Sequence, residues 1–403
     1  MHVRSFSRLL LFTSLLVAIT ASAQNNPCSV ISQGPEGSLN GFVPFPASSL
    51  WNTNISNAPV DPNSAAIISF IGSSTPLHPD FGSGLYQGHT FGIPYIVVPV
   101  NEPLINLGLT SFGAESDPGP MPIPMNAPIE GYPNPVGDRH VLILDRGNCW
   151  LYELFGAYKQ SAGYWTAASS AVWDLEANEQ RPYTWTSADA AGLPIFPGLV
   201  RYDEVAAGRI NHAIRMTMQY SKQAFTPPAS HWAATSSNPL AAPMGMRMRL
   251  KASFDISGYP PEDQVILTAL KQYGAIMADN GTSMYIGGTT DTRWNNDHLQ
   301  SMRGVTASDF EVLRISPLYT PQNVPTGPNP TINSFTATSS GGRGQPVTLS
   351  WTVTNGEYYI VAPSVGAIRG NSVTVNPVVT TVYTLYATNP YGRTTTTVTV
   401  RVP

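Results

Sequence analysis

The sequence predicts a mainly β protein. The chain of 403 residues contains 37 prolines and 34 glycines, and only 11% of its residues are charged. Proline and glycine mark turns, and short runs rich in β-branched and aromatic residues lie between them, so the pattern is typical of short strands with many connections. We predict a β-sandwich or jelly-roll-like main domain with one or two helices, and a small β-sandwich at the C-terminus.

The N-terminus has the pattern of a secretory signal peptide. Arg4 and Arg8 precede an apolar run from Leu9 to Ile19, and small residues follow up to Ala23. This pattern predicts a signal peptide over residues 1–23. No later stretch is long and apolar enough to span a bilayer. We therefore expect a secreted protein, extracellular or periplasmic, with no membrane span.

The charge balance argues against a nucleic-acid partner. The chain has 21 Lys and Arg against 25 Asp and Glu, and loss of Arg4 and Arg8 with the signal peptide leaves a net charge of −6. No run of basic residues is present. Because phosphate binding needs clustered positive charge, we predict no nucleic-acid binding.

Two cysteines remain in the exported chain. Cys28 lies near the mature N-terminus and Cys149 lies far along the chain. In an oxidising compartment we expect them to form a disulfide, worth roughly 2–4 kcal/mol in the chain-entropy model. Neither cysteine has a partner at metal-ligand spacing, so we assign no metal ligands.

A β-hairpin over residues 137–155 is the central prediction, and its register decides what its polar residues can do. If Asp145 pairs with Asn148, His140 lies opposite Glu153, close enough for the two to tune one another for proton transfer. If Asp145 pairs with Cys149, that contact is lost. The structural alternative is a buried histidine whose hydrogen bonds a carboxylate satisfies.

Ionisable residues gather again between residues 189 and 212, where a helical turn at 203–207 precedes a strand that begins near His212. We expect His140, Glu153, Asp203 and His212 to converge in one cleft, with Arg201 close to a bound anion. The candidate catalytic residues are His140, Glu153, Asp189, Asp203, Glu204 and His212. The candidate substrate-binding residues are Trp150, Trp185, Arg201, Tyr202 and Trp294.

Further elements follow from local patterns. Periodic apolar residues predict helices at 63–71 and 260–273. Residues 276–277 and 284–286 flank a turn at 279–281 and predict a second hairpin. His78, Asp80 and His89 invite a metal interpretation, but their spacing matches no known ligand pattern, so surface-loop residues are the preferred interpretation.

The C-terminal part differs in composition. Prolines mark a stiff linker at 317–330, which separates a main domain at 24–316 from residues 331–403. The last segment alternates threonine and valine and resembles the Ig-like accessory modules of bacterial secreted enzymes, with Trp351 as the core tryptophan. We expect few contacts across the linker.

The main domain resembles a group of uncharacterised exported soil-bacterial proteins. The segments 137–140 (Gly-Asp-Arg-His) and 199–204 (Leu-Val-Arg-Tyr-Asp-Glu) carry this resemblance, which implies no activity and no functional residue. The chain contains no Gly-x-Ser-x-Gly, His-Glu-x-x-His, P-loop or Gly-x-Gly-x-x-Gly motif, so common hydrolase, protease and nucleotide-binding signatures are absent.

Two functions from different classes are consistent with this pattern. The favoured one is a carbohydrate-active enzyme, either a glycoside hydrolase with two of the four candidate carboxylates or a polysaccharide lyase using Arg201 with His140, His212 or Tyr202. The alternative is a non-catalytic glycan-binding or cell-surface protein. In both cases we expect a monomer with a polysaccharide partner and no required cofactor. Both functions are compatible with a bound divalent metal ion.

Overall fold

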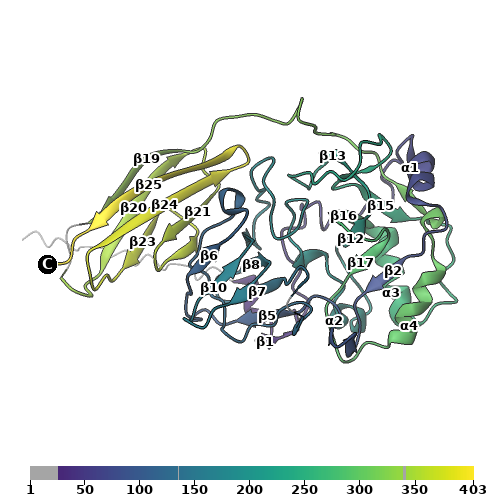
Figure 1. Ribbon diagram of the computed structural model, residues 1–403, viewed down its shortest axis with the longest axis horizontal. Coiled ribbons are helices and arrows are strands. Elements are labelled where there is room, and N and C mark those ends of the chain that lie inside the picture. The colour runs from purple at the N-terminus through teal and green to yellow at the C-terminus, as the bar shows by residue number, and fades with distance from the viewer. Residues whose placement is uncertain (1–25, 135, 339–341) are drawn as a thin grey trace, which may run out of the picture.

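The computed structural model describes residues 26–134, 136–338 and 342–403, and it is mainly β, as predicted (Figure 1). The predicted signal peptide at residues 1–23 lies outside the described residues. Within the described part, no helix is long and apolar enough to cross a membrane.

A five-stranded sheet, here called the central sheet, has the order β1-β5-β7-β8-β11, with β5 and β7 parallel. Its strands are β1 (Gly34–Pro35), β5 (Tyr95–Val98), β7 (Val141–Asp145), β8 (Trp150–Phe155) and β11 (Ser169–Asp174). In β7, Leu142 and Leu144 pack into the hydrophobic cluster on one face, whereas Val141 and Ile143 pack into the cluster on the other. Because both faces are covered, the strand is apolar throughout rather than alternating.

The hairpin predicted over residues 137–155 exists as β7 and β8, where β7 begins only at Val141, and both predicted registers are wrong. Asp145 pairs with Trp150, and Leu142 rather than His140 lies opposite Glu153. The Asp145 carboxylate accepts hydrogen bonds from the backbone of Gly147 and Asn148 at 2.9 and 3.0 Å. These bonds stabilise a four-residue loop, longer than either predicted connection, and His140 precedes the paired strand.

A six-stranded sheet, here called the second sheet, has the order β18-β15-β16-β12-β17-β2. Its strands are β2 (His78–Asp80), β12 (Ile214–Met218), β15 (Arg247–Leu250), β16 (Ala275–Asn280), β17 (Tyr285–Gly287) and β18 (Phe310–Val312). The helices α1 (Ser64–Ile71), α2 (Tyr202–Ala206), α3 (Pro261–Gln272) and α4 (Asn296–Ser301) lie with this sheet, at the end of the molecule far from the C-terminus (Figure 1).

The helix predicted at 260–273 is confirmed as α3, which buries Ile266, Leu267 and Leu270. The second predicted hairpin is wrong. β16 and β17 do not pair, because β12 lies between them, parallel to β16 and antiparallel to β17. The turn at 279–281 therefore connects two strands that belong to the same sheet but are separated in it by β12.

The remaining strands and short helices connect these sheets. The further strands of the main region are β3 (Leu85–Tyr86), β4 (His89–Thr90), β6 (Leu107–Leu109), β9 (Tyr158–Lys159), β10 (Trp165–Ala167), β13 (Ser221–Phe225) and β14 (Ala242–Met244). The 3-10 helices are η1 (Pro27–Val30), η2 (Gly113–Glu115), η3 (Phe196–Gly198), η4 (Met302–Gly304) and η5 (Ala307–Asp309).

Residues 331–403 form a two-sheet β-sandwich, as predicted. One sheet has the order β19-β20-β23 and the other β22-β21-β24-β25. The strands are β19 (Thr331–Ala337), β20 (Val347–Thr354), β21 (Tyr358–Ala362), β22 (Gly366–Ile368), β23 (Ser372–Val375), β24 (Thr381–Asn389) and β25 (Gly392–Val400). Trp351 lies in its buried core. The likeness to Ig modules themselves stays a prediction.

The expectation of few contacts across the linker is wrong. Asp117, which is fully buried in the main region, pairs with Arg181 at 2.6 Å and also with Arg393 of β25. The hydroxyl of Tyr358 donates to the same carboxylate at 3.1 Å. Although burial alone would raise the pKa of Asp117, the two arginines hold it below its usual value. The sandwich therefore shares a buried ionic cluster with the main region.

The predicted disulfide between Cys28 and Cys149 is present, with the Cα atoms 5.4 Å apart and a sequence separation of 121. It attaches the N-terminal segment to the β7–β8 loop. A loop of 121 residues lies above the typical range expected from the sequence, so the chain-entropy model now gives a loss of about 4–5 kcal/mol of unfolding free energy for the Cys28→Ser/Cys149→Ser protein. Denaturant unfolding measures this loss. Mass mapping without reductant that finds two alkylatable thiols contradicts the pairing.

Asp117→Asn tests the ionic cluster beneath the sandwich. The change leaves buried Arg181 without its charge partner, so we expect a loss of about 3–5 kcal/mol in urea unfolding. Glu176→Gln is the matched control, because Glu176 also pairs with an arginine of the sandwich, Arg369, at 3.1 Å but is part exposed. We expect the control to lose less than about 1 kcal/mol. Equal losses for the two variants contradict a special role for Asp117.

Candidate functional site

A polar cavity of about 390 Å³, here called the cleft, lies where the loop before β7 faces β2, β12, β16 and β17 of the second sheet. Its size is in the range of small-molecule sites. The cleft gathers a large share of the chain's few ionisable side chains. Those lining it are Asp80, His89, Glu130, Asp138, Arg139, His140, Arg215 and Asp279.

Arg215 of β12 forms the floor on the side of the second sheet. Its guanidinium donates two hydrogen bonds to buried Asp189, at 2.6 and 2.8 Å, and its Nη2 lies 3.4 Å from Oδ2 of Asp279. Burial raises the pKa of Asp279 to about 7, with Asp189 adding to the rise and Arg215 opposing it. Asp279 is thus a carboxyl group able to hold a proton near neutral pH.

The opposite wall carries an ion pair of His140 and Glu130. Nδ1 of His140 lies 2.6 Å from Oε2 of Glu130, and Nε2 lies 3.0 Å from the Ala188 carbonyl, so both ring nitrogens can donate. Burial alone would lower the pKa of His140, but Glu130 outweighs it and raises that pKa to about 9. Likewise burial would raise the pKa of Glu130, but His140 holds it below its usual value. Glu130 is therefore ionised at neutral pH.

The backbone fixes this pair in place. The Glu130 N–H donates to the His140 carbonyl at 2.9 Å, and the His140 N–H donates to Oε2 of Glu130 at 3.3 Å. Within the described chain, these hydrogen bonds to the Glu130 side chain all use Oε2. The Glu130 side chain keeps about 24% of its exposure and lines the cleft, so it can contact a molecule bound there.

Two consecutive residues connect the walls. Ala188 accepts the hydrogen bond of His140, and the next residue, Asp189, binds Arg215. The Ser187 hydroxyl donates to the Leu193 carbonyl at 2.5 Å and holds this turn in shape. The relative position of Glu130 and Asp279 is therefore set by one short buried segment.

Three residues of the cleft could hold a divalent metal ion. Glu130, Asp138 and His140 each offer a ligand atom, and these atoms lie within 4.8 Å of one another. Two carboxylates and an imidazole suit transition metals. The ion would have to replace the proton that His140 shares with Glu130, so protonation of His140 and metal binding would compete.

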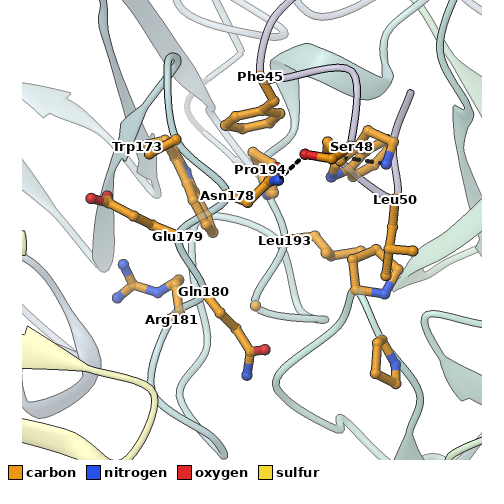
Figure 2. Close-up of a pocket in the computed structure, with 16 residues that line it drawn as sticks. Phe45, Ser48, Leu50, Trp173, Asn178, Glu179, Gln180, Arg181, Leu193 and Pro194 are labelled. Carbon is orange, nitrogen blue, oxygen red and sulfur yellow. Dashed lines mark hydrogen bonds between the residues drawn. The ribbon is translucent and has the colours of Figure 1, made fainter. Parts of the chain in front are cut away.

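A second cavity, of about 220 Å³, lies beside Trp173 and is lined by fewer charged side chains than the cleft. Figure 2 shows the carboxylate of Glu179 and the guanidinium of Arg181 at one end of it, with Leu50 and Leu193 towards the other. Arg181 is already paired with Asp117, and burial raises the pKa of Glu179 to about 8. Among the described residues that line it, Glu179 is the one carboxyl group, so this cavity lacks the pair of titratable groups that acid and base chemistry uses.

The expected convergence of His140, Glu153, Asp203 and His212 is wrong, because only His140 lines the cleft. Glu153 is fully buried behind the central sheet, where it accepts hydrogen bonds from the backbone of Ile195 and Phe196 at 3.0 and 2.8 Å. It also accepts one from the indole of Trp173 at 3.1 Å. Glu153 therefore joins two segments of the interior.

The predicted residues around α2 form a separate buried cluster. Arg201 donates to Nε2 of His212 at 2.8 Å and pairs with Glu204 at 2.8 Å. Asp203 accepts hydrogen bonds from Ser38 and Leu39, both at 2.9 Å. Asp203 and Glu204 line a different, smaller cavity, and Arg201 is too enclosed to meet a bound anion.

The remaining predicted residues are structural in their contacts. Asp189 lies behind the cleft and binds Arg215. Trp150 and Trp185 lie under arginines of the C-terminal sandwich, Arg369 and Arg393. Tyr202 and Trp294 pack against one another with ring centroids 4.9 Å apart, and Trp294 is buried. None of these four aromatic side chains lines the cleft.

Glu130, Arg215 and Asp279 line the cleft but are not among the site residues that the sequence predicts. Glu130 lies in a proline-rich loop without periodicity, and the local pattern predicts a turn at Asp279. The sequence does contain one indication of Arg215, which is a charged residue between the apolar residues Ile214 and Met216 of a strand. Asp80 and His89 were noted for their proximity in sequence, and both line the cleft.

Comparisons with family models, with the curated proteins and with solved structures found no match to this chain.

Glu153→Gln separates a structural carboxylate from a catalytic one. The glutamine amide nitrogen is a donor, and it would face the Trp173 indole N–H or the backbone N–H groups, which are also donors. At least one buried hydrogen bond would therefore be lost. We expect a loss of about 1–3 kcal/mol in thermal or urea unfolding. A Glu153→Gln protein as stable as the wild type contradicts this assignment.

Proposed function

We propose that the protein is a secreted glycoside hydrolase whose active site is the cleft. The observation that carries the proposal is that two carboxyl groups from different walls meet in one cavity, each held by its own cationic partner: Glu130 by His140, and Asp279 by Arg215. Glycosidic bond hydrolysis uses two such carboxyl groups, one as acid and one as base or nucleophile.

The electrostatics support a division of roles. Asp279, whose pKa is raised to about 7, would protonate the leaving oxygen. Glu130, whose pKa is lowered, would act as the ionised base or nucleophile. When two carboxyl groups lie in environments that separate their pKa values, the group with the higher pKa acts as the acid and the other as the base or nucleophile.

The pairing of the cations in the cleft favours hydrolysis of a neutral polysaccharide over a lyase reaction. His140 is paired with Glu130 and Arg215 with Asp189, and Arg139 donates to the backbone carbonyl of Ala157. A lyase must neutralise a uronate carboxylate with a cation, and these three are already engaged. Arg201, the expected cation for such a step, is buried elsewhere with Glu204.

Aromatic side chains at the cleft offer surfaces for sugar rings. Tyr86, on the short β3–β4 hairpin, is 56% exposed and lines the cleft. Tyr285 also lines it, with one face stacked on His78 at a centroid distance of 4.1 Å. Sugars bind through such exposed aromatic faces, whose burial contributes favourable free energy.

Turnover of neutral polysaccharides tests the proposal. We expect reducing-sugar release by the wild-type protein, and Asp279→Asn and Glu130→Gln should each lower kcat by about 10² to 10⁴-fold. Because Asp279 must be protonated to act, activity should fall as pH rises through about 7. Asp263→Asn is the control, since Asp263 in α3 also has a raised pKa, about 6, but binds Ser301 outside the cleft.

Three outcomes contradict the hydrolase. One is binding of a polysaccharide without release of reducing ends, which supports a glycan-binding protein. Another is release of unsaturated products, which indicates a lyase. The third is full activity in both Asp279→Asn and Glu130→Gln.

A further inference from the structure

A further pocket, different from the cavity beside Trp173 and here called the side pocket, adjoins the cleft. It has a volume of about 500 Å³ and is lined mainly by apolar side chains. Thr90 lines both cavities, and Ile129 of the side pocket directly precedes Glu130 of the cleft. A chain of sugar residues bound in the cleft would therefore place a neighbouring residue against the side pocket.

The side pocket contains polar groups without partners. Among the described residues, the buried side-chain atoms that lack a hydrogen-bond partner include Nε1 of Trp165, Oε2 of Glu36 and Oγ1 of Thr90, all on residues that line this pocket. Trp165 is fully buried. The other oxygen of Glu36 accepts the Tyr95 N–H at 3.0 Å. Buried polar groups without partners are costly, so such a concentration indicates groups that a ligand satisfies.

We propose that the side pocket binds the N-acetyl group of a sugar residue, and that the substrate is a neutral polysaccharide containing N-acetylated sugars. This proposal rests on the proposed function of the cleft. An acetamido group carries a carbonyl acceptor, an N–H donor and a methyl group within a few atoms. The pocket offers an indole donor, a carboxyl group, and apolar side chains such as Met125, Ile129 and Pro94.

The match holds in either protonation state of Glu36. As a carboxylate, its free oxygen accepts the acetamido N–H; as an acid, it donates to the acetamido carbonyl, as the Trp165 indole does. A plain hydroxyl group would satisfy these atoms but leave the apolar lining without a methyl group to bury. A carboxylate substituent would lose its hydration against the apolar lining, where Lys159 is exposed on β9 rather than buried in the pocket.

Calorimetric titration of the full chain with trisaccharides tests the proposal. We expect the trimer of N-acetylglucosamine to bind at least about tenfold more tightly than the trimer of glucose or that of glucosamine. Trp165→Phe removes the indole donor and keeps the ring, so this preference should shrink about five- to tenfold. Glu36→Gln should shrink it as well, which guards against a folding defect in the tryptophan variant.

Trp351→Phe is the matched control. Among the residues that the structure describes, the buried Nε1 of Trp351 also lacks a hydrogen-bond partner, but Trp351 lies in the core of the C-terminal sandwich. This variant should keep the full preference for the acetylated trimer. Equal binding of the three trimers, an unchanged preference in both pocket variants, or equally tight binding of an N-acetylated dipeptide amide overturns the proposal.

The two proposals fail separately. If the protein hydrolyses neutral polysaccharides but shows no preference for the acetylated trimer, the cleft assignment stands and the side pocket assignment is wrong. If the acetylated trimer binds preferentially but no polysaccharide is cleaved, the side pocket assignment stands and the hydrolase is wrong.

Discussion

The bond between Asp189 and Arg215 is the interaction on which the cleft depends. Both side chains are nearly buried, and two hydrogen bonds of 2.6 and 2.8 Å fix their geometry. A buried ion pair of this kind adds little net stability, but removal of one partner leaves a costly charge behind. Because Ala188 holds His140 and Asp189 holds Arg215, this pair sets the position of one wall of the cleft relative to the other.

The site chemistry follows from this arrangement. Asp279 lies beside Arg215, which is already bound to Asp189, so burial prevails and raises the pKa of Asp279 to about 7. Glu130 lies against His140, whose charge holds the pKa of Glu130 below its usual value. Two groups of the same chemical type thereby differ in protonation near neutral pH. The apolar side pocket beside them adds a place where a substituent of the substrate could determine specificity.

The sequence predicted what short-range patterns determine. The helix at 260–273, the β7 and β8 strands, the sandwich at 331–403 and the Cys28–Cys149 pair needed only periodicity, composition and the number of cysteines. His140 was also recognised as a site candidate. Its actual partner, Glu130, lies only ten residues away. That partner could not be recognised, because no periodic pattern places a side chain within a proline-rich loop.

Long-range pairing accounts for the other errors. Arg215 meets Asp279 because β12 enters between β16 and β17, and a local turn pattern contains no information about an inserted strand. The hairpin register depended on the Asp145 side chain, whose hydrogen bonds lengthen the loop. The ionisable residues around His212 were clustered in sequence, but they satisfy one another in the interior and not at a site.

The most direct test of this account is a carboxyl ¹³C NMR titration of the wild-type protein, with Asp279→Asn and Glu130→Gln used to assign the two resonances. The account predicts that Asp279 titrates near pH 7, while Glu130 titrates below the usual glutamate range. Titration of both groups at ordinary carboxyl values, near pH 4, contradicts the claim that the cleft separates an acid from a base.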